Sequence, residues 1–437
     1  MWGSVRFAFV ALAALTATFA TPASTTAQAA TSCTATGPIK SYLNWFDNSS
    51  PGMMADNIHI VNVGAGPSSG CVTVGGGQGV FWGVGPGEET YVTMPAGTHG
   101  GPVQVTVNNY VAGAAIAASQ RVQFYSAFSE LWATSSTQAA TTSYFSWYDR
   151  STPGMVNDNI HVANLGTVDA TVTVSLPGAT AQTIMVPAGT EGYASFPQGT
   201  IGGPVTVTST QPVLASQRVQ YYSSFNEVWA STAPQAATKS YFNWFDVTSP
   251  GEVTDNIHIL NPGTTTANVS ISIPNSNQAT ASIAPGGEAV LSLPDGVFLS
   301  HCIPCQQHPP MGGPLTVSSD QPVLASERVQ FYSSFSEILA AGPSQAATSS
   351  HFNWYDKASP GMYNDNVHLS NPGTVDASVT VTLAGAPPQT ITVVGGNTGY
   401  VNFPGQIGGP VTVSSTQPVL VSQRVQYYRS FSEVWSG

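Results

Sequence analysis

Two stretches that recur along the chain decide its fold, and the third copy shows both: Ser240-Tyr-Phe-Asn-Trp-Phe-Asp246 and Asp255-Asn-Ile-His-Ile-Leu-Asn-Pro-Gly263. The Trp of the first stretch and the His of the second keep one spacing in four copies, at Trp45 and His59, Trp147 and His161, Trp244 and His258, and Trp354 and His368. A further phrase, Val213 to Ala230 (VLASQRVQYYSSFNEVWA), also recurs, with substitutions, in each of the four copies. The chain is therefore built from four copies of one unit.

The copies set the expected domain boundaries. Each unit has about 100 residues, a normal size for a small domain and more than twice the length of a propeller blade. We expect domains at 41–133, 143–230, 240–340 and 350–437, called repeats 1 to 4 below. Short Ala/Ser/Thr-rich joints separate them, so the sequence predicts an elongated, semi-rigid rod.

Within a unit the hydrophobic residues alternate, as in Ala170–Leu176 and Val379–Leu383. A period of two with β-branched residues indicates half-buried strands. Pro-Gly pairs, such as Pro153-Gly154, mark turns that need a positive φ at the glycine. No window shows a helical stripe. The pattern predicts an all-β protein of four tandem immunoglobulin-like β-sandwich domains, each with seven or eight short strands.

The N-terminus has the three parts of a secretory signal peptide. Arg6 precedes the apolar run Phe7–Ala20, and a polar region then ends in Ala27-Gln28-Ala29. This run is too short to span a bilayer. We expect 1–30 to be removed and the mature protein to be secreted or held at the cell surface, with no membrane span.

Charge excludes one class of partner. The 437 residues include 10 Lys+Arg and 22 Asp+Glu, for a net charge of -12. Nucleic-acid binding needs basic side chains that neutralise phosphates, so nucleic acid is excluded as a partner. A hydrophobic content of 42% is nevertheless enough to build cores.

The phrases SPGM-x-x-DNIH-x-x-NPG and VLASQRVQYYSSFNEVWA resemble repeats of secreted and surface bacterial proteins that have no assigned activity. Asn-Pro-Gly followed by a Thr/Val strand is also similar to Ig-like adhesion modules of bacterial exoproteins. The resemblance covers 41–437 and implies spacers or binders. Repeat 1 departs from it, because Val63-Gly64 replaces Pro-Gly and Ala112–Ala118 lengthens a loop.

Charged residues recur at fixed positions in a chain that has few of them. One reading is a structural ion pair in each repeat, between Arg121 and Glu130, Arg218 and Glu227, Arg328 and Glu337, and Arg424 and Glu433, because guanidinium and carboxylate pair through matched geometry. The other is calcium, for which Asp149, Asp158, Asn159 and Glu227 and their equivalents supply oxygen ligands. No compact calcium loop occurs, and both readings stay open.

Aromatic residues offer a possible binding surface. Trp45, Trp147, Trp244 and Trp354 either pack at sandwich ends and joints or stack on sugar rings, as in carbohydrate-binding modules. The His of each DNIH lies on a strand without further zinc ligands at fixed spacing, so we expect a hydrogen-bonded strand histidine. No catalytic motif of a known hydrolase or nucleotide-binding enzyme occurs.

Four cysteines in an exported chain predict two disulfides. Cys33 and Cys71 fall in repeat 1 and its N-terminal extension, and a bond between them would fix that extension. Cys302 and Cys305 lie in an insertion of repeat 3, His301-Cys-Ile-Pro-Cys-Gln-Gln-His308. A zinc site and a redox motif are the alternatives for this string.

We therefore expect an exported, non-enzymatic, multi-domain rod without cofactors that acts as an extracellular adhesion or spacer protein. The alternative is a tandem carbohydrate- or cell-wall-binding protein that uses surface aromatics, and a hydrolase is the third hypothesis. Cell-wall polysaccharide and other surface proteins are the expected partners.

Overall fold

The structure is a computed structural model, and it describes residues 32–111, 113, 115–274, 278–293 and 311–437. These residues form strands β1 to β38 and three short 3-10 turns, η1 to η3, and no α-helix occurs among them. The prediction of an all-β protein is confirmed. The strands form because β-branched residues alternate along the chain, a pattern that suits a pleated sheet with one buried face.

Repeat 1 and its N-terminal extension form two main sheets. The strands are β1 (Ser32–Cys33), β2 (Ile39–Leu43), β3 (Phe46–Asp47), β4 (Met53–Asn62), β5 (Ser68–Val74), β6 (Gly79–Val84), β7 (Glu89–Thr93), β8 (His99–Gly100), β9 (Val103–Tyr110), β10 (Ile116–Phe124) and β11 (Ala127–Trp132). Their orders are β1-β6-β5-β9-β2 and β11-β10-β4-β7, and β3 pairs with β8.

Repeats 2, 3 and 4 share one strand pattern, and a 3-10 turn precedes each. Repeat 2 has η1 (Ser136–Gln138), β12 (Ala140–Phe145), β13 (Tyr148–Asp149), β14 (Met155–Ala163), β15 (Ala170–Ser175), β16 (Gln182–Val186), β17 (Glu191–Ala194), β18 (Ile201–Gly202), β19 (Val205–Tyr221) and β20 (Ser224–Trp229). Repeat 3 has η2 (Ala233–Gln235), β21 (Ala237–Phe242), β22 (Phe245–Asp246), β23 (Glu252–Leu260), β24 (Ala267–Ser272), β25 (Gln278–Ile283), β26 (Glu288–Leu291), β27 (Met311–Gly312), β28 (Leu315–Phe331) and β29 (Ser334–Leu339). Repeat 4 has η3 (Pro343–Gln345), β30 (Ala347–Phe352), β31 (Tyr355–Asp356), β32 (Met362–Ser370), β33 (Ala377–Leu383), β34 (Gln389–Val393), β35 (Thr398–Val401), β36 (Ile407–Gly408), β37 (Val411–Tyr427) and β38 (Ser430–Trp435).

One long strand organises each of these three repeats. In repeat 2, the first part of β19 pairs with β12 and β15, and its second part pairs with β14 and β20. The two strand layers therefore share β19 and enclose one core, which includes Val174 of β15 and Ile160 of β14. In repeat 1 the lengthened loop separates this strand into β9 and β10, so the predicted departure of repeat 1 lies there.

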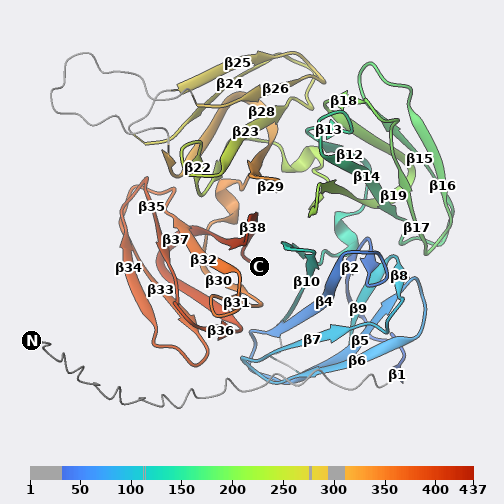
Figure 1. Cartoon of the computed structure of the whole chain (residues 1–437), viewed down its shortest axis with the longest axis vertical. Coiled ribbons are helices and arrows are strands. Elements are labelled where there is room, and N and C mark those ends of the chain that lie inside the picture. The colour runs from blue at the N-terminus through green and yellow to red at the C-terminus, as the bar shows by residue number, and fades with distance from the viewer. Residues whose placement is uncertain (1–31, 112, 114, 275–277, 294–310) are drawn as a thin grey trace, which may run out of the picture.

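The four repeats close into a ring (Figure 1). The last strands β11, β20, β29 and β38 contact one another in cyclic order around the centre. Trp132 Nε1 of repeat 1 donates to the carbonyl of Trp435 in repeat 4 at 2.7 Å, and Trp229 Nε1 donates to the carbonyl of Trp132 at 2.9 Å. The prediction of an elongated rod is therefore wrong, because residues at the end of each repeat pack against the next repeat and form hydrogen bonds with it.

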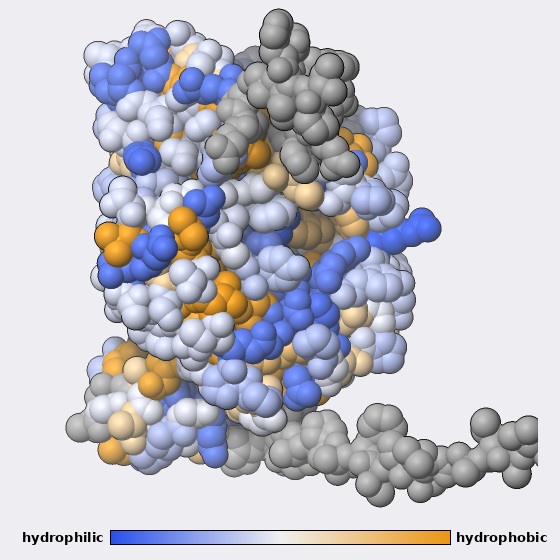
Figure 2. Space-filling model, turned by 90° about the vertical axis from the view of Figure 1, so that its left-hand side faces the viewer, coloured by the Kyte–Doolittle hydropathy of each residue, from blue (hydrophilic) through white to orange (hydrophobic). Residues whose placement is uncertain are grey.

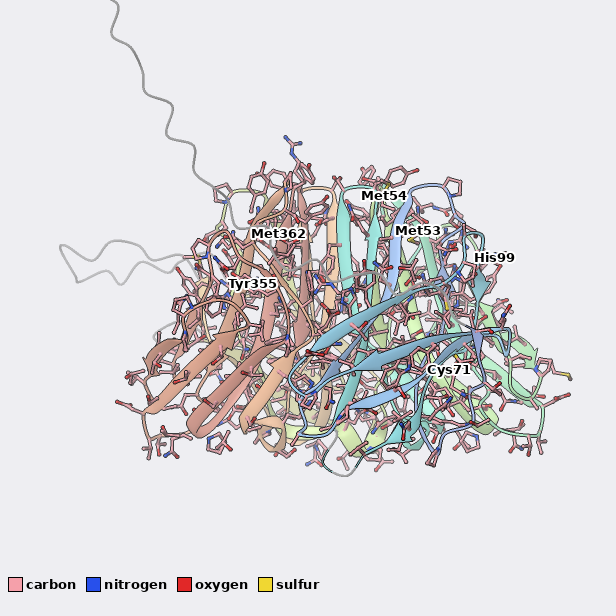
Figure 3. The ribbon with its side chains drawn as sticks, turned by 90° about the horizontal axis from the view of Figure 1, so that it is seen from below. Met53, Met54, Cys71, His99, Tyr355 and Met362 are labelled. Carbon is pink, nitrogen blue, oxygen red and sulfur yellow. A yellow bond between two sulfur atoms is a disulfide. The ribbon has the colours of Figure 1, made fainter. Side chains whose placement is uncertain are left out.

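The outer surface is mixed in character. Figure 2 shows one side of the ring, where separate hydrophobic patches lie among polar and neutral residues. Met53 and Met54 of β4 and Met362 of β32 lie toward the same end of the molecule (Figure 3). This end also holds the hairpin tips between the long strands and the last strands, because Met53 pairs with Phe124 at the end of β10.

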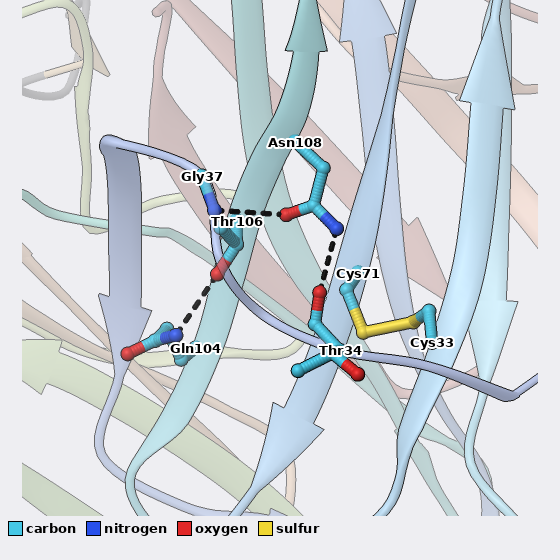
Figure 4. The surroundings of a disulfide bond; sticks show 7 residues. All are labelled: Cys33, Thr34, Gly37, Cys71, Gln104, Thr106 and Asn108. Atoms are coloured by element: carbon cyan, nitrogen blue, oxygen red, sulfur yellow. Dashed lines mark hydrogen bonds between the residues drawn. A yellow bond between two sulfur atoms is a disulfide. The ribbon is translucent and has the colours of Figure 1, made fainter.

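The N-terminal extension is fixed to repeat 1 by a disulfide between Cys33 and Cys71 (Figure 4). Asn108 holds the same segment, since its side-chain amide donates to the Thr34 carbonyl at 2.6 Å and its oxygen accepts from Gly37 N–H at 3.1 Å. The predicted Cys33–Cys71 pairing is confirmed. The prediction for Cys302 and Cys305 falls outside the described residues.

Candidate binding grooves between repeats

The repeated tryptophans lie at the junctions between repeats. The Trp of each repeat packs against the histidine of the Asp-Asn-Ile/Val-His stretch in the next repeat, and the Trp of repeat 4 packs against the histidine of repeat 1. The ring centroids are 5.3 Å apart for Trp45 and His161, 5.2 Å for Trp147 and His258, 5.5 Å for Trp244 and His368, and 5.7 Å for Trp354 and His59. Each indole is only half-buried, so one part of it stays accessible.

The histidines are held by a carboxyl group in three repeats. His161 Nδ1 lies 2.6 Å from Glu191 Oε1, and the same distance joins His258 to Glu288 and His59 to Glu89. Burial lowers the pKa of His161 well below its ordinary value and raises the pKa of Glu191 to about 8. Burial thus disfavours the charged form of both partners, and the short distance joins them in a hydrogen bond. The expectation of a hydrogen-bonded strand histidine agrees with this geometry in repeats 1 to 3, whereas His368 Nδ1 of repeat 4 has no hydrogen-bond partner among the described residues.

The repeated Arg and Glu also belong to the junctions. In repeat 4, Arg424 Nη1 lies 3.3 Å from Glu433 Oε2, and the Ser422 hydroxyl donates to Glu433 Oε1 at 2.6 Å. Asn243 of repeat 3 donates to that hydroxyl at 2.8 Å. The Arg–Glu distances in the other repeats are 3.1 Å for Arg121 and Glu130, 3.0 Å for Arg218 and Glu227, and 3.6 Å for Arg328 and Glu337. Each pair thus fixes a polar contact to the preceding repeat.

The residues of the calcium hypothesis already have other partners. Asp149 Oδ1 accepts from two backbone N–H groups of its own loop at 2.8 and 2.9 Å. Asp158 accepts from the Asp149 N–H at 2.8 Å and from Gln217 Nε2 at 2.7 Å. Glu227 pairs with Arg218, and Asn159 lies opposite Arg218 in the adjacent strand. No three His, Cys, Asp or Glu side chains converge on a common point in the part of the chain that the structure describes.

Grooves open at the junctions beside these tryptophans. Their volumes are about 250 Å³ between repeats 2 and 3, 340 Å³ between repeats 3 and 4, and 440 Å³ between repeats 4 and 1. The lining shared by the three is a Trp and an Asp from one repeat and an Asn, a His, an Arg, a Gln and a Phe from the next. In the groove between repeats 2 and 3 the residues of the second repeat are Asn256, His258, Arg328, Gln330 and Phe335. They are Asn366, His368, Arg424, Gln426 and Phe431 between repeats 3 and 4, and Asn57, His59, Arg121, Gln123 and Phe128 between repeats 4 and 1. The arrangement offers an aromatic surface with amide and hydroxyl hydrogen-bonding groups around it.

The junctions are of two alternating kinds. Gln123 donates to the hydroxyl of Tyr427 across the junction from repeat 4 to repeat 1 at 3.0 Å. Gln330 does the same to Tyr221 between repeats 2 and 3 at 2.8 Å. At the other two junctions phenylalanine replaces the tyrosine.

At the junctions with phenylalanine, the glutamine side chain instead accepts a hydrogen bond from an asparagine of its own repeat. Asn364 Nδ2 donates to Gln426 Oε1 at 2.9 Å, and Asn157 Nδ2 donates to Gln220 Oε1 at 3.2 Å. Alternating Gln-Phe-Tyr and Gln-Tyr-Tyr in the recurring phrase is the sequence signal for this difference. The predictions from the sequence did not include this difference between junctions.

No family model matches the sequence, and no curated protein matches it. One solved structure with which the chain aligns is described as "Crystal structure of tetra-tandem repeat in extending region of large adhesion protein". It is 11% identical over 90% of this chain and 92% of that chain, with a TM-score of 0.11. Within the described residues no helix is long and apolar enough to cross a membrane.

Proposed function

We propose that the protein is an exported, non-enzymatic adhesion protein that binds carbohydrate multivalently through the grooves between its immunoglobulin-like repeats. The observation that carries this proposal is the recurrence of one lining, a half-buried Trp beside Asn, Gln and Arg, at junction after junction. An enzyme needs one reactive centre, whereas matched weak sites increase the avidity for a polymeric ligand.

Several features support carbohydrate as the ligand class. Volumes of about 250 to 440 Å³ suit one or two sugar units. Indole faces pack against the apolar face of a pyranose ring, and amide groups pair with its hydroxyls. The Cys33–Cys71 disulfide is compatible with an extracellular location. A spacer role is favoured less, because repeat 4 contacts repeat 1 and the ring adds little length.

Retention of the mature chain on cell-wall material and on a panel of insoluble polysaccharides tests the proposal. We expect saturable retention that is lost when Trp45, Trp147, Trp244 and Trp354 are all replaced by Ala. The matched Trp→Phe variant keeps an apolar ring at each junction and should retain part of the binding, with an unchanged circular dichroism spectrum. Absence of retention on every glycan would refute carbohydrate adhesion.

A further inference from the structure

The groove between repeats 3 and 4 differs from the others at two positions where the remaining three repeats agree. Glu252 of repeat 3 stands where the other repeats have Met53, Met155 and Met362. Thr398 of repeat 4 stands where the others have the histidine-binding carboxylates Glu89, Glu191 and Glu288. Both changes fall on the same junction, although they lie in different repeats.

Three polar atoms at this groove have no partner among the described residues. His368 has lost its carboxyl partner, and its Nδ1 is buried without a hydrogen bond, although the residue is only 6% exposed. The Thr398 hydroxyl donates instead to the Leu369 carbonyl at 3.0 Å. Glu252 Oε1 and Asn366 Oδ1 are also buried and unpartnered, and all three side chains line this groove.

The other two grooves contain no comparable set. Among the described polar side chains that line these two grooves, the only buried atoms without a hydrogen bond are the guanidinium nitrogens of the Arg–Glu pairs. Buried polar groups without hydrogen bonds are costly, and in native proteins they are rare. Other buried polar atoms of the described residues also lack partners, but of the three grooves this one alone gathers three of them besides its arginine, where a bound molecule can pair with them.

We infer that the groove between repeats 3 and 4 is a dedicated binding site for an N-acetylated amino sugar of a glycan chain. This inference rests on the proposed carbohydrate function and deepens it. Trp244 and the half-exposed Tyr400, which stacks on His368 at 5.6 Å, supply the aromatic surface for the sugar ring. Gln426 and Asn366 supply an amide donor and a carbonyl acceptor, which match the carbonyl and the N–H of an acetamido group.

The amide of Gln426 is available because this junction lacks the bridging tyrosine hydroxyl. Phe331 occupies that position, and Asn364 holds only the oxygen of Gln426, at 2.9 Å. Glu252, which also lines this groove, adds hydrogen-bonding oxygens for the sugar hydroxyls. A pyranose without the acetamido group leaves the amide groups unmatched and should bind more weakly.

Calorimetry on the mature full-length chain with two soluble probes tests the inference: the tetrasaccharide of β-1,4-linked N-acetylglucosamine, and cellotetraose, which lacks the acetamido groups. We expect the N-acetylated probe to bind at least tenfold more tightly. The variant E252M/T398E restores the residues that the other repeats carry at these positions. It should lose at least tenfold in affinity while its melting temperature stays equal or rises, because the His–Glu pair is rebuilt.

A second variant transfers the two residues to the junction between repeats 1 and 2, where a phenylalanine also replaces the bridging tyrosine. The variant M53E/E191T should add a second site for the N-acetylated probe. Failure of the wild type to bind this probe, unchanged binding by E252M/T398E, or no added site in M53E/E191T would each overturn the inference. Glycan retention that depends on the four tryptophans but not on these positions would overturn it and leave the proposed function intact.

Discussion

A single buried residue shows how a repeat tolerates a change of charge. Gln217 donates to Asp158 and to the Trp147 carbonyl, and Gln120 and Gln423 make the same bonds in repeats 1 and 4. Repeat 3 has Glu327 at this position, fully buried beside Asp255. Two ionised carboxylates cannot donate to each other, so a proton on Glu327 is needed to complete the hydrogen bond to Asp255.

The variant E327Q should therefore stabilise the protein, by about 1–3 kcal/mol at pH 8. Burial and the neighbouring Asp255 raise the pKa of Glu327 well above its ordinary value of 4.5. The folded state holds a proton that the unfolded state releases. The stability that the protonated Glu327 gives the wild type is therefore fully present below pH 4.5 and is lost as the pH rises toward the raised pKa. Chemical denaturation at pH 5 and pH 8 measures the effect.

The mirror variant Q217E supplies the control, since it places the same carboxyl pair in repeat 2. It should destabilise the protein more at pH 8 than at pH 5. A pH-independent effect of both variants would contradict the assignment of the proton to Glu327.

Arg218 provides a second prediction for a single residue. It lies 3.0 Å from the buried Glu227, and its guanidinium covers the Phe225 ring at 4.7 Å. Replacement by Ala leaves a buried carboxylate unpaired, so R218A should cost about 3–5 kcal/mol of unfolding free energy. The exposed Arg429 is the control, and R429A should cost less than about 1 kcal/mol. Equal losses for the two variants would show that the ion pair is not structural.

At the scale of elements, the turns carry the most specific sequence signal. The Pro-Gly pairs were predicted to need a positive φ at glycine, and Gly154 has a φ of 97°. The sequence did not predict what lies over this glycine. The hairpin after each long strand begins with a tyrosine of positive φ, namely Tyr125, Tyr222, Tyr332 and Tyr428, with φ between 49° and 51°. Turn preferences point to Gly or Asn there, and the tyrosine is held by packing on a loop that is distant in sequence.

Gly154 should accordingly be less replaceable than other turn glycines. A Cβ on Gly154 would lie 2.2 Å from the Tyr222 ring, whereas a Cβ on Gly178, with a φ of 80°, meets nothing within 4 Å. Both G154A and G178A force Ala into the left-handed region, at about 1–2 kcal/mol. G154A should cost about 1–3 kcal/mol more because of the overlap with the ring. Thermal melts compare the two, and losses of the same size would contradict the packing role of Tyr222.

At the scale of the whole molecule, the sequence could not distinguish contacts within a repeat from contacts between repeats. Trp147 and His258 stand in successive copies, but each copy also contains its own Trp and His at the same positions. The repeated pattern is the same whether each Trp packs on the His of its own repeat or on the His of the next. Strands, turns and the disulfide could therefore be predicted from the sequence, but the ring could not. The direction of each contact, from one repeat to the next, depends on the orientation that the short joints impose.

The ring has one junction that no joint bridges, between repeats 4 and 1. Asn353 donates to Ser119 Oγ at 2.8 Å and to the His59 carbonyl at 3.2 Å there, and Trp354 packs on His59. At the other three junctions a short covalent joint keeps the neighbours at high effective concentration. Weakening the unbridged junction should therefore open the ring more readily than weakening any other.

Small-angle X-ray scattering of the mature chain tests this closure. A compact chain of this length has a radius of gyration of about 22 Å, and a rod of the same four repeats would have about twice that value. We expect the compact value for the wild type and a clear increase for N353A/W354A. The matched variant S146A/W147A, at the bridged junction between repeats 2 and 3, should change it less, because the joint holds both repeats together after their contacts weaken. A wild-type value near that of the rod, or equal increases in the two variants, would show that the contact between repeats 4 and 1 does not close the ring in solution.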